Sequence, residues 1–270
     1  NKVLSLNDDE PSLASRVNWG NFNNAYPYIA IPGHPIAMFY GHIFDGVYQY
    51  TDFDKVGESY ILKDGVPNNG NAREKIQPGD IKFKDINRDG VVNDYDLTII
   101  GNPNPKHIGG VGNNFQYKNF DLNVFFQWSY GGDVLNANRI EFEGGDPNAR
   151  TSLNMFASFA NRWTPENQTN ELYRIGGQGP AVYSSRTIED GSFLRLKTVS
   201  LGYRLPNAWL KKINIKSLRV YASAQNLITW TRYSGPDPEV STRPTALTPS
   251  FDWSPYPRPR TLTLGVDISF

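Results

Sequence analysis

Hydrophobic and polar residues alternate most regularly over the last ten positions of the chain, which read TLTLGVDISF. Successive side chains of a β-strand point to opposite faces, so this segment predicts a strand with one apolar side and one polar side. In a soluble β-sandwich the apolar side would face a core, whereas in an outer-membrane barrel it would face lipid and the polar side would line the lumen. The two sets are Leu262, Leu264, Val266, Ile268 and Phe270 against Thr261, Thr263, Gly265, Asp267 and Ser269.

Strands of similar length are predicted over 108–117, 120–130, 193–205 and 218–230. In 120–130 one parity is wholly apolar with aromatic residues at both ends, as an interfacial girdle would require, and Phe125 is the exception on the other parity. In 193–205 the apolar parity continues into Arg195 and Lys197, which we expect above the lipid at one end of the strand. In 218–230 the apolar parity is interrupted by Asn226.

The first fifty residues give weaker signals. Residues 1–6 read as the end of a strand that would begin before the chain does, and the following residues up to 35 read as loop. The segment 36–50 is dense in aromatic and β-branched residues and predicts a strand, with a bend or bulge at Gly41 and Gly46.

Long and short connections alternate along the chain. The predicted loops 51–107, 131–191 and 232–259 are long, whereas the turn at Lys118-Asn119 and the connection 206–215 are short. A short helix is predicted inside the second loop, over 152–162, from apolar residues at helical spacing. Long loops on one side and short turns on the other favour an outer-membrane barrel, and three loops of this length would be unusual in a soluble sandwich.

Composition limits the remaining possibilities. The 27 basic and 27 acidic residues cancel, which gives no reason to expect a nucleic-acid partner. The absence of cysteine excludes disulfides and thiol chemistry. No apolar run approaches the roughly 20 residues of a membrane-spanning helix, so only a β-barrel would allow this chain to cross a bilayer.

One segment, 85–96, has the spacing of a calcium-binding loop. Its sequence is DINRDGVVNDYD, with Gly90 at the sixth position, where such loops turn sharply. Aspartate at the twelfth position, in place of the general glutamate, resembles the calcium loops of dockerins. We expect bound calcium to be structural, while a metal-free Asp/Asn/Gly turn is the alternative. The candidate ligands are Asp85, Asn87, Asp89, the Val91 carbonyl, Asn93 and Asp96.

No constellation of residues predicts an enzyme. The histidines are dispersed, the paired carboxylates are explained equally well by a solvated loop, and the loop aromatics suit packing better than sugar stacking. Nucleophile elbows, phosphate-binding glycine loops and zinc motifs are absent from the sequence. The residues concerned are His34, His42, His107, Glu141, Glu143, Trp163, Trp253 and Tyr256.

Several segments in a fixed order make the chain resemble a known family. They include PIAMFYGHIFDGVYQ, GDIKFKDINRDGVVNDYDLTIIGNPNPKHIGGVGNNFQYKNFDLNVFFQWSYGGDV, NRWTPEN, IEDGSFLRLKTVSLGYRLP, LRVYASAQNLITWTRYSGPDPEV and YPRPRTLTLGVDISF. Over residues 33–270 the sequence resembles the C-terminal part of SusC/RagA-like TonB-dependent outer-membrane transporters of Bacteroidota. The family often carries its own DxNxDG segment where 85–96 falls.

The resemblance implies an all-β fold: the C-terminal portion of a large antiparallel transmembrane β-barrel, of about 22 strands when complete and with a plugged lumen. This chain would supply the end of one strand and then the last six, and Phe270 would be the terminal aromatic read by the assembly machinery. The plug and the segment that contacts TonB would lie outside these residues, so we expect the chain to be part of a longer polypeptide. Without that part, the strand at 36–50 would leave an unpaired edge in lipid.

The function implied is TonB-dependent uptake through the bacterial outer membrane. The three long loops would be extracellular and would meet a SusD-like surface lipoprotein, and the substrates would be oligosaccharides or peptides. The alternative from a different class is a secreted, calcium-stabilised β-sandwich that binds glycans. The two differ in what covers the apolar face of the final strand, since lipid covers it in a barrel and a second sheet covers it in a sandwich.

Overall fold

The computed structural model describes residues 2–7, 10–17, 25–144, 153–181, 183–211, 214–242 and 245–270. The chain forms two compact units, which are treated one at a time. Unit 1 comprises Asn1–Asn104, Asp133–Glu189 and Val240–Pro255, and unit 2 comprises Pro105–Gly132, Asp190–Glu239 and Tyr256–Phe270. Among the described residues, no helix is both long enough and apolar enough to cross a bilayer.

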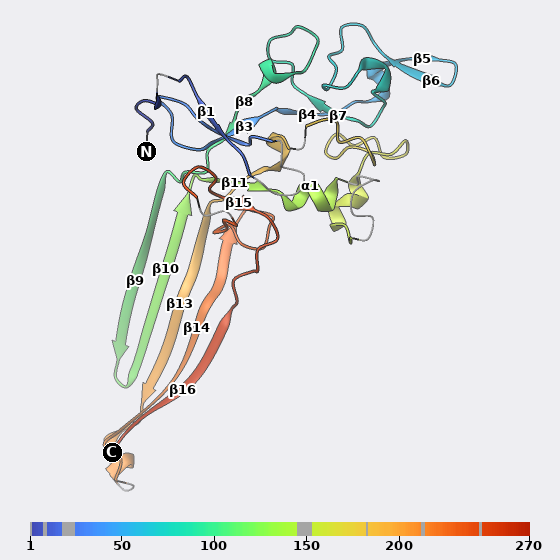
Figure 1. The fold of residues 1–270 in the computed structure, drawn as a ribbon. Helices are drawn as coiled ribbons and strands as arrows, with labels where there is room; N and C mark the ends of the chain where they lie inside the picture. Colours follow the sequence, from blue (N-terminus) through green and yellow to red (C-terminus); the bar gives the residue numbers. More distant parts are fainter. Residues whose placement is uncertain are drawn as a thin grey trace. The chain divides into compact units, whose positions relative to one another are not determined.

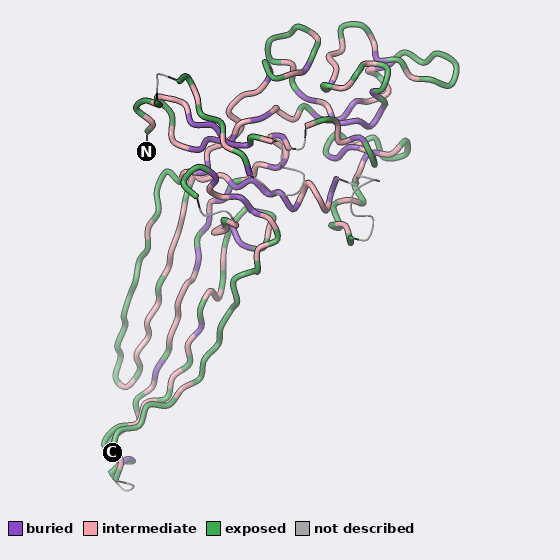
Figure 2. The backbone as a smooth tube through the Cα atoms, viewed as in Figure 1, coloured by how far each residue is buried: buried purple, intermediate pink, exposed green. Residues whose placement is uncertain are grey.

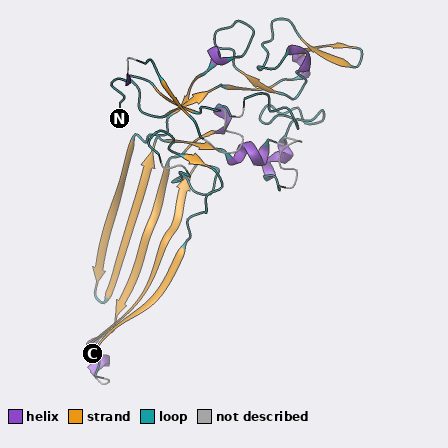
Figure 3. Ribbon diagram, in the orientation of Figure 1, coloured by secondary structure: helices purple, strands orange, loops and turns teal. Residues whose placement is uncertain are grey.

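Unit 2 is built on one antiparallel sheet of five long strands in the order β16-β14-β13-β10-β9 (Figure 1). A tight turn at Lys118, whose φ is +52°, joins the first two strands of this sheet in the chain. The only helix in the described part of this unit is α2, Asn207–Leu210, between β13 and β14 (Figure 3). The strands are β9 His107–Tyr117, β10 Phe120–Tyr130, β13 Phe193–Arg204, β14 Ser217–Thr231 and β16 Thr261–Ser269.

The pairing register aligns the apolar sides of all five strands on one face. Leu264 lies opposite Ala222, which lies opposite Leu201, which in turn lies opposite Leu122 and then Phe115. Side chains alternate between the two faces along each strand. Once these five residues lie on one face, every second residue on either side of them lies on that face too, up to the next bulge. The alternation predicted for 120–130, 218–230 and 261–270 is therefore confirmed as a single apolar face.

The expected facing of Arg195 and Lys197 is wrong, because a β-bulge changes the parity of β13. The register shifts between Leu196 and Thr198 against both neighbouring strands, so Lys197 is an extra residue there. Beyond the bulge, Leu194 and Leu196 occupy the apolar face, and Arg195 lies opposite Gln127 on the polar face. The same irregularity accommodates Asn226 of β14, whose φ is +51°.

The glycines of β9 make room for aromatic rings of β10. A Cβ added at Gly109 would lie 2.4 Å from the Trp128 ring, and one at Gly110 would lie 2.8 Å from the Phe125 ring. The rings of Trp128 and Phe125 thus lie over glycines, which have no side chain in the way. This explains both the many glycines of β9 and the presence of an aromatic residue, Phe125, on the otherwise polar side of β10.

Unit 1 contains short strands in four small sheets, ordered β1-β2-β3-β8, β12-β11-β15, β4-β7 and β5-β6. Its helix α1, Asn138–Glu143, follows β11. The strands are β1 Leu13–Ser15, β2 Tyr28–Ala30, β3 Met38–Gly41, β4 Phe44–Val47, β5 Phe53–Val56, β6 Ser59–Leu62, β7 Ile81–Phe83, β8 Thr98–Gly101, β11 Asp133–Asn136, β12 Ile188–Asp190 and β15 Phe251–Asp252. The 3-10 helices are η3 Tyr50–Asp52, η4 Arg73–Lys75, η5 Asp94–Asp96, η6 Ala157–Asn161 and η7 Ser185–Thr187.

The segment 36–50 is not one long strand in the sheet of unit 2, contrary to the prediction. It forms β3 and β4, which end near the two predicted bends, and these strands pair with β2, β8 and β7 inside unit 1. The expected unpaired edge in lipid at 36–50 therefore does not arise. The part of the chain that the structure describes forms five long strands rather than six, and residues 2–7 form no strand.

Each predicted long loop contains ordered structure. The loop 51–107 includes β5 to β8, and the loop 131–191 includes β11, α1 and β12. Of the predicted helix 152–162, the structure has the 3-10 helix η6, and residue 152 lies outside the described residues.

Figure 2 shows buried stretches along several segments of unit 1. Among the described residues, the buried apolar side chains of this unit form three clusters. One cluster contains Tyr28, Phe39 and Phe251, a second contains Phe83 and Trp163, and a third contains Tyr48. Burial of side chains of this size is the main stabilising contribution in such a unit. The long predicted loops are therefore held by buried apolar cores, the first of which they share with residues 17–39.

Candidate functional site

The apolar face of the five-stranded sheet is exposed rather than packed. Leu262 and Leu264 are 78% and 86% exposed, and Phe115 is 57% exposed. The described part of unit 2 contains no second sheet that would cover this face. A sandwich needs such a cover, since its inner faces pack about 10 Å apart. The arrangement suits a surface whose solvent is hydrocarbon rather than water.

Aromatic residues gather at both ends of this face. Near the turn at Lys118, Phe120 lies between Tyr117 and Tyr203 in the register, and its ring centroid is 4.7 Å from that of Tyr203. Near the other end, Trp128 and Trp230 both lie opposite Leu194. Amphipathic rings at two levels of an apolar band are what an interface with lipid headgroups favours.

The polar face carries an ion-pair bridge across four strands. Arg219 of β14 donates from Nε and Nη2 to the two carboxylate oxygens of Asp121 on β10, at 3.0 and 2.6 Å. Its Nη1 donates to Asp267 of β16 at 3.2 Å. The side chain crosses β13 at Gly202, where an added Cβ would lie 2.5 Å from the guanidinium. Sequence reasoning missed this bridge, although opposite charges on the polar parity of nearby strands were its available signal.

A second set of charges holds the segment after β14. The side chain of Arg195 is only 1% exposed, and its Nη2 donates to Asp237 Oδ1 at 2.6 Å. Glu239 lies 3.4 Å from Arg195 and 3.1 Å from Arg258. A buried arginine needs such partners, because an unpaired buried charge is costly. The bulge in β13 is what places Arg195 among them.

The candidate calcium loop has the turn that its sequence predicts. Arg88 and Gly90 both have positive φ, +62° and +84°. The Asp85 carboxylate accepts from the backbone N–H groups of both residues, at 2.6 and 2.8 Å. Asp89 accepts from Val91 N–H at 2.8 Å. The early acidic residues thus stabilise the turn through its own backbone.

Asp96 closes the loop from its other end. Its side chain is fully buried, and one oxygen accepts from Ile86 N–H at 2.7 Å while the other accepts from Asn93 N–H at 2.9 Å. Among the described residues, no three His, Asp or Glu side chains are gathered in a metal-binding arrangement. The proposed set also uses amide and carbonyl oxygens, and the two Asp85 oxygens, which accept one hydrogen bond each, keep a second lone pair for a cation. The residues therefore fit calcium in kind, and binding stays a prediction.

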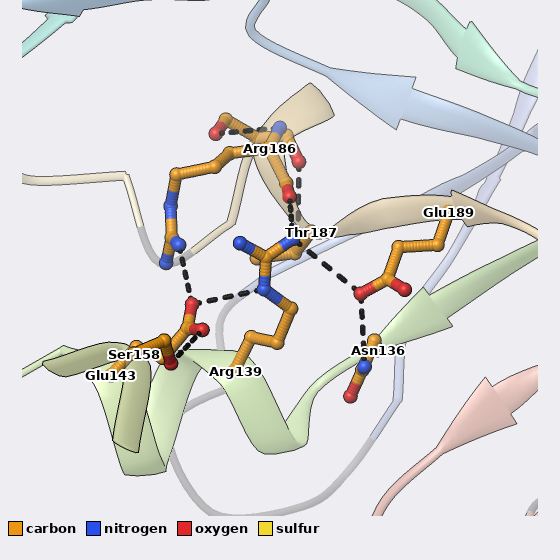
Figure 4. A network of polar contacts seen from close by, with 8 residues as sticks. Asn136, Arg139, Glu143, Ser158, Arg186, Thr187 and Glu189 are labelled. Carbon is orange, nitrogen blue, oxygen red and sulfur yellow. Dashed lines mark hydrogen bonds and ion pairs between the residues drawn. The ribbon is translucent and has the colours of Figure 1, made fainter. Parts of the chain in front are cut away.

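Glu143 lies in a buried polar network rather than in a solvated loop (Figure 4). Its carboxylate accepts from Arg139 at 2.9 Å, from Arg186 at 2.7 Å and from Ser158 at 2.6 Å. Burial alone would raise the pKa of Glu143, but the Ser158 hydroxyl and the two arginines outweigh it and lower that pKa. Arg139 also reaches Glu189 at 3.4 Å, so the network ties α1 to η7 and β12.

The histidines and loop aromatics are not brought together into one site. His107 accepts from the indole N–H of Trp128 at 3.1 Å in unit 2, whereas His34 and His42 belong to unit 1. Trp163 is buried and donates to Gln49 at 3.0 Å, as expected for loop packing. Trp253 packs against the first core cluster, and Tyr256 is exposed.

Comparisons with known proteins give a consistent result. No protein-family model matches the chain. It is 34% identical to the TonB-dependent receptor P3 of Formosa agariphila over 275 residues, which cover 100% of this chain and 26% of that protein. It is 32% identical to the TonB-dependent receptor SusC of Bacteroides thetaiotaomicron over 200 residues, which cover 73% of this chain and 18% of that protein.

Among solved structures, the chain is similar to the RagAB peptide transporter, with a TM-score of 0.70 and 24% sequence identity. That match covers 100% of this chain and 26% of the transporter chain, and it shows a shared fold. The chain spans about a quarter of the length of the first relatives it matches. The names of these relatives are those of receptors and transporters, and none is an enzyme.

Proposed function

Because this chain belongs to the SusC/RagA-like TonB-dependent receptors and forms part of an outer-membrane β-barrel, we propose that the complete protein imports nutrients across the outer membrane. The substrate class is oligosaccharides or peptides. The energy comes from TonB, driven by the proton gradient of the inner membrane. The partner at the cell surface is a SusD-like lipoprotein.

The observation that supports the proposal best is the two-sided sheet of unit 2. Its apolar face is continuous across five strands and exposed, while its other face carries the Arg219 bridge and many hydroxyl and amide groups. Such a sheet is stable where one face meets lipid and the other lines a polar lumen. It would expose too much apolar surface in a protein that works in water.

The experiment that tests the proposal compares two arginine substitutions on the same strand of the complete protein. Leu264→Arg places a charge on the apolar face and should cost roughly 2–4 kcal/mol if that face meets the bilayer midplane. Thr263→Arg, on the polar face of the same strand, is the matched control. We expect the first variant to be lost from outer-membrane fractions and the second to assemble normally.

Normal membrane assembly of both variants would contradict the lipid-facing assignment. Uptake of a labelled oligosaccharide or peptide pool by cells then tests transport itself. We expect uptake to stop when the proton gradient is dissipated and to be retained in the Thr263→Arg strain. Uptake that persists without the gradient would contradict TonB dependence while leaving the barrel assignment intact.

We also propose that the loop 85–96 binds one structural calcium ion. What supports this is the turn at Arg88 and Gly90, in which the Asp85 carboxylate accepts from the N–H groups of those two residues and the Asp89 carboxylate accepts from Val91 N–H. The remaining candidate ligands, Asn87, Asn93, Asp96 and the Val91 carbonyl, stand at the spacing of a calcium loop. The ion would hold the loop by balancing its acidic side chains, and it takes no part in chemistry.

A further inference from the structure

The two short connections of unit 2 lie at one end of its sheet, and they have no role in the function proposed so far. One is the turn at Lys118-Asn119, and the other is the segment 205–216, which contains α2. Phe120 of β10 lies opposite Tyr203 of β13, which places both connections at the same end. This end, formed by 117–120, 203–218 and the last residues of β16, is called the short-turn end below.

The short-turn end is basic. The segment 205–216 carries three lysines and no acidic residue, although the whole chain has as many acidic as basic residues. Lys118 adds a further positive charge at the other connection. Within the described residues, no ion pair involves Lys118, Lys211 or Lys216, and all three are exposed.

The acidic residues of unit 2 do not neutralise these lysines. One group adjoins the opposite ends of β13 and β14, next to the long connections. The other group lies on the polar face of the sheet, where Arg219 binds both of its carboxylates. The first group is Asp190, Asp237 and Glu239, and the second is Asp121 and Asp267.

Two of the lysines line one hollow beside α2. The hollow has a volume of about 400 Å³, and Lys216 is held beside β16 because its backbone N–H donates to the Ser269 carbonyl at 2.8 Å. Ammonium and amide groups supply hydrogen-bond donors, which suit the oxygens of a phosphate group. The lining residues are Asn207, Lys211, Asn214, Ile215 and Lys216.

The positive charges lie at the edge of the apolar face. Lys216 directly precedes β14 and has the parity of Leu218, which belongs to that face. Lys118 Nζ lies 5.3 Å from the centre of the Tyr117 ring, and Tyr117 has the apolar parity of β9. Trp209 of α2 is 64% exposed. Lysines and amphipathic rings at the border of an apolar band are suited to the level of lipid headgroups.

The position of the hollow selects a lipid over a free anion. Short turns of an outer-membrane barrel face the periplasm, and the periplasmic leaflet of that membrane consists of phospholipids. Basic segments next to a bilayer attract anionic headgroups. A free anion would satisfy the lysines alone, whereas a phospholipid would also cover the apolar face that begins beside them.

We propose that the hollow beside α2 binds the headgroup of an anionic phospholipid of the periplasmic leaflet, such as phosphatidylglycerol. Lys211 and Lys216 donate to the phosphate oxygens, and the Asn207 and Asn214 amides donate to the remaining headgroup oxygens. The acyl chains lie along the apolar face of the sheet. The proposal requires the barrel to sit in lipid, and it does not depend on which substrate is imported or on TonB.

The test is native mass spectrometry of the complete protein, delipidated in detergent and titrated with lipids of identical acyl chains. We expect phosphatidylglycerol to bind roughly tenfold more tightly than phosphatidylcholine, whose choline group offsets the phosphate charge. A large excess of inorganic phosphate should not displace it. The double variant Lys211→Gln with Lys216→Gln should weaken phosphatidylglycerol binding by roughly tenfold.

Single substitutions at the same end provide the matched comparison. Lys216→Gln should weaken binding, and Lys216→Arg, which keeps the charge, should retain it. Arg204→Gln is the control, because Arg204 is exposed at the short-turn end but lies opposite Arg219 on the polar face. We expect the control to bind phosphatidylglycerol as the parent does and all variants to be recovered from outer-membrane fractions.

Equal affinities for the two lipids, or equal loss of binding in Lys216→Gln and Arg204→Gln, would overturn the proposal. Displacement of the lipid by inorganic phosphate would show a site for free anions and would also overturn it. Because only protein that has assembled in the membrane is titrated, these outcomes are separate from failure of the Leu264→Arg comparison or of uptake.

Discussion

At the scale of single residues, a few charged side chains hold together segments that are distant in sequence. Glu143 joins α1 to Arg186 in η7, and Arg219 joins β14 to Asp121 on β10. In both cases one carboxylate accepts two or more charge-assisted hydrogen bonds, which are the stronger kind. The sequence identified Glu143 only as one of a pair of carboxylates, because nothing local indicates which arginines will surround it.

The pH dependence of unit 1 should reflect Glu143. Its pKa is lowered in the folded state, so the stability it contributes is present above its unfolded pKa of about 4.3 and is lost as pH falls from there through the folded pKa. Glu143→Gln removes the charge and leaves the buried Arg186 guanidinium without its carboxylate partner, at a cost of about 3 kcal/mol, while the partly exposed Arg139 keeps Glu189. Hydrogen exchange of α1 amides in the complete protein, followed from pH 7 to pH 3, measures both effects.

We expect the α1 amides of the Glu143→Gln variant to exchange faster than those of the parent at pH 7. In the parent, exchange should speed up as the pH falls from 5 to 3, and in the variant most of that acceleration should be absent. Glu171→Gln, at an exposed position of the same unit, is the control and should behave as the parent. If the two variants exchange alike at every pH, the network does not stabilise α1.

At the scale of elements, the long strands and the calcium-type loop differ in what fixes them. Each long strand alternates by itself, but its facing depends on its neighbours, as the bulge at Lys197 shows. The loop 85–96 is local, since Asp85 and Asp89 bond to backbone groups within five residues. The spacing of residues was therefore enough to predict the turn of the loop 85–96. It could not predict on which face of the sheet Arg195 lies, because the bulge at Lys197 depends on the neighbouring strands.

Calcium should protect the segment 51–107 from proteolysis if the loop binds it. In the complete protein, chelation of calcium should expose this segment to protease, and calcium readdition should restore protection, because the ion offsets repulsion among the acidic side chains. The double variant Asp85→Ala with Asp89→Ala should lose the calcium-dependent difference, and Asp64→Ala should keep it. If chelation does not change the cleavage of the parent protein, the calcium proposal is wrong.

At the scale of the whole molecule, unit 2 contains the sheet of long strands, and unit 1 contains the ordered segments that connect those strands. The segments predicted as long loops contribute most strands of unit 1, its helix α1 and part of each of the three buried clusters, so they are suited to present a fixed surface. A fixed surface favours binding of a partner, because less chain is ordered on association. This is the physical basis for expecting a surface lipoprotein there.

Purification of the complete protein from outer membranes in mild detergent should recover a SusD-like lipoprotein in a near-equal amount. A matched sample carrying a deletion of the exposed β5–β6 hairpin, whose tip residues include Val56 and Ser59, tests whether that part of the surface contributes. Mass spectrometry of the two samples gives the ratio of the two proteins. Recovery of the receptor without any lipoprotein would contradict the proposed partnership.

The sequence by itself determined the five long strands and the apolar side of most of them. Alternation has a period of two, which is a local property of the extended backbone, so it survives without knowledge of the partner strands. The same holds for the turn at Gly90, which depends on residues adjacent in sequence. The family resemblance, carried by whole segments in order, was confirmed by the relatives that the chain matches.

Only the tertiary structure decided the features that depend on pairing between distant segments. It divided 36–50 into two short strands of unit 1, moved Leu194 and Leu196 to the apolar face through a bulge, and enclosed Glu143 among arginines. Register, bulges and buried ion pairs are set by contacts between residues far apart in the chain. These contacts form only when the chain is folded, and their energies depend on one another. A pattern within one segment therefore does not predict them.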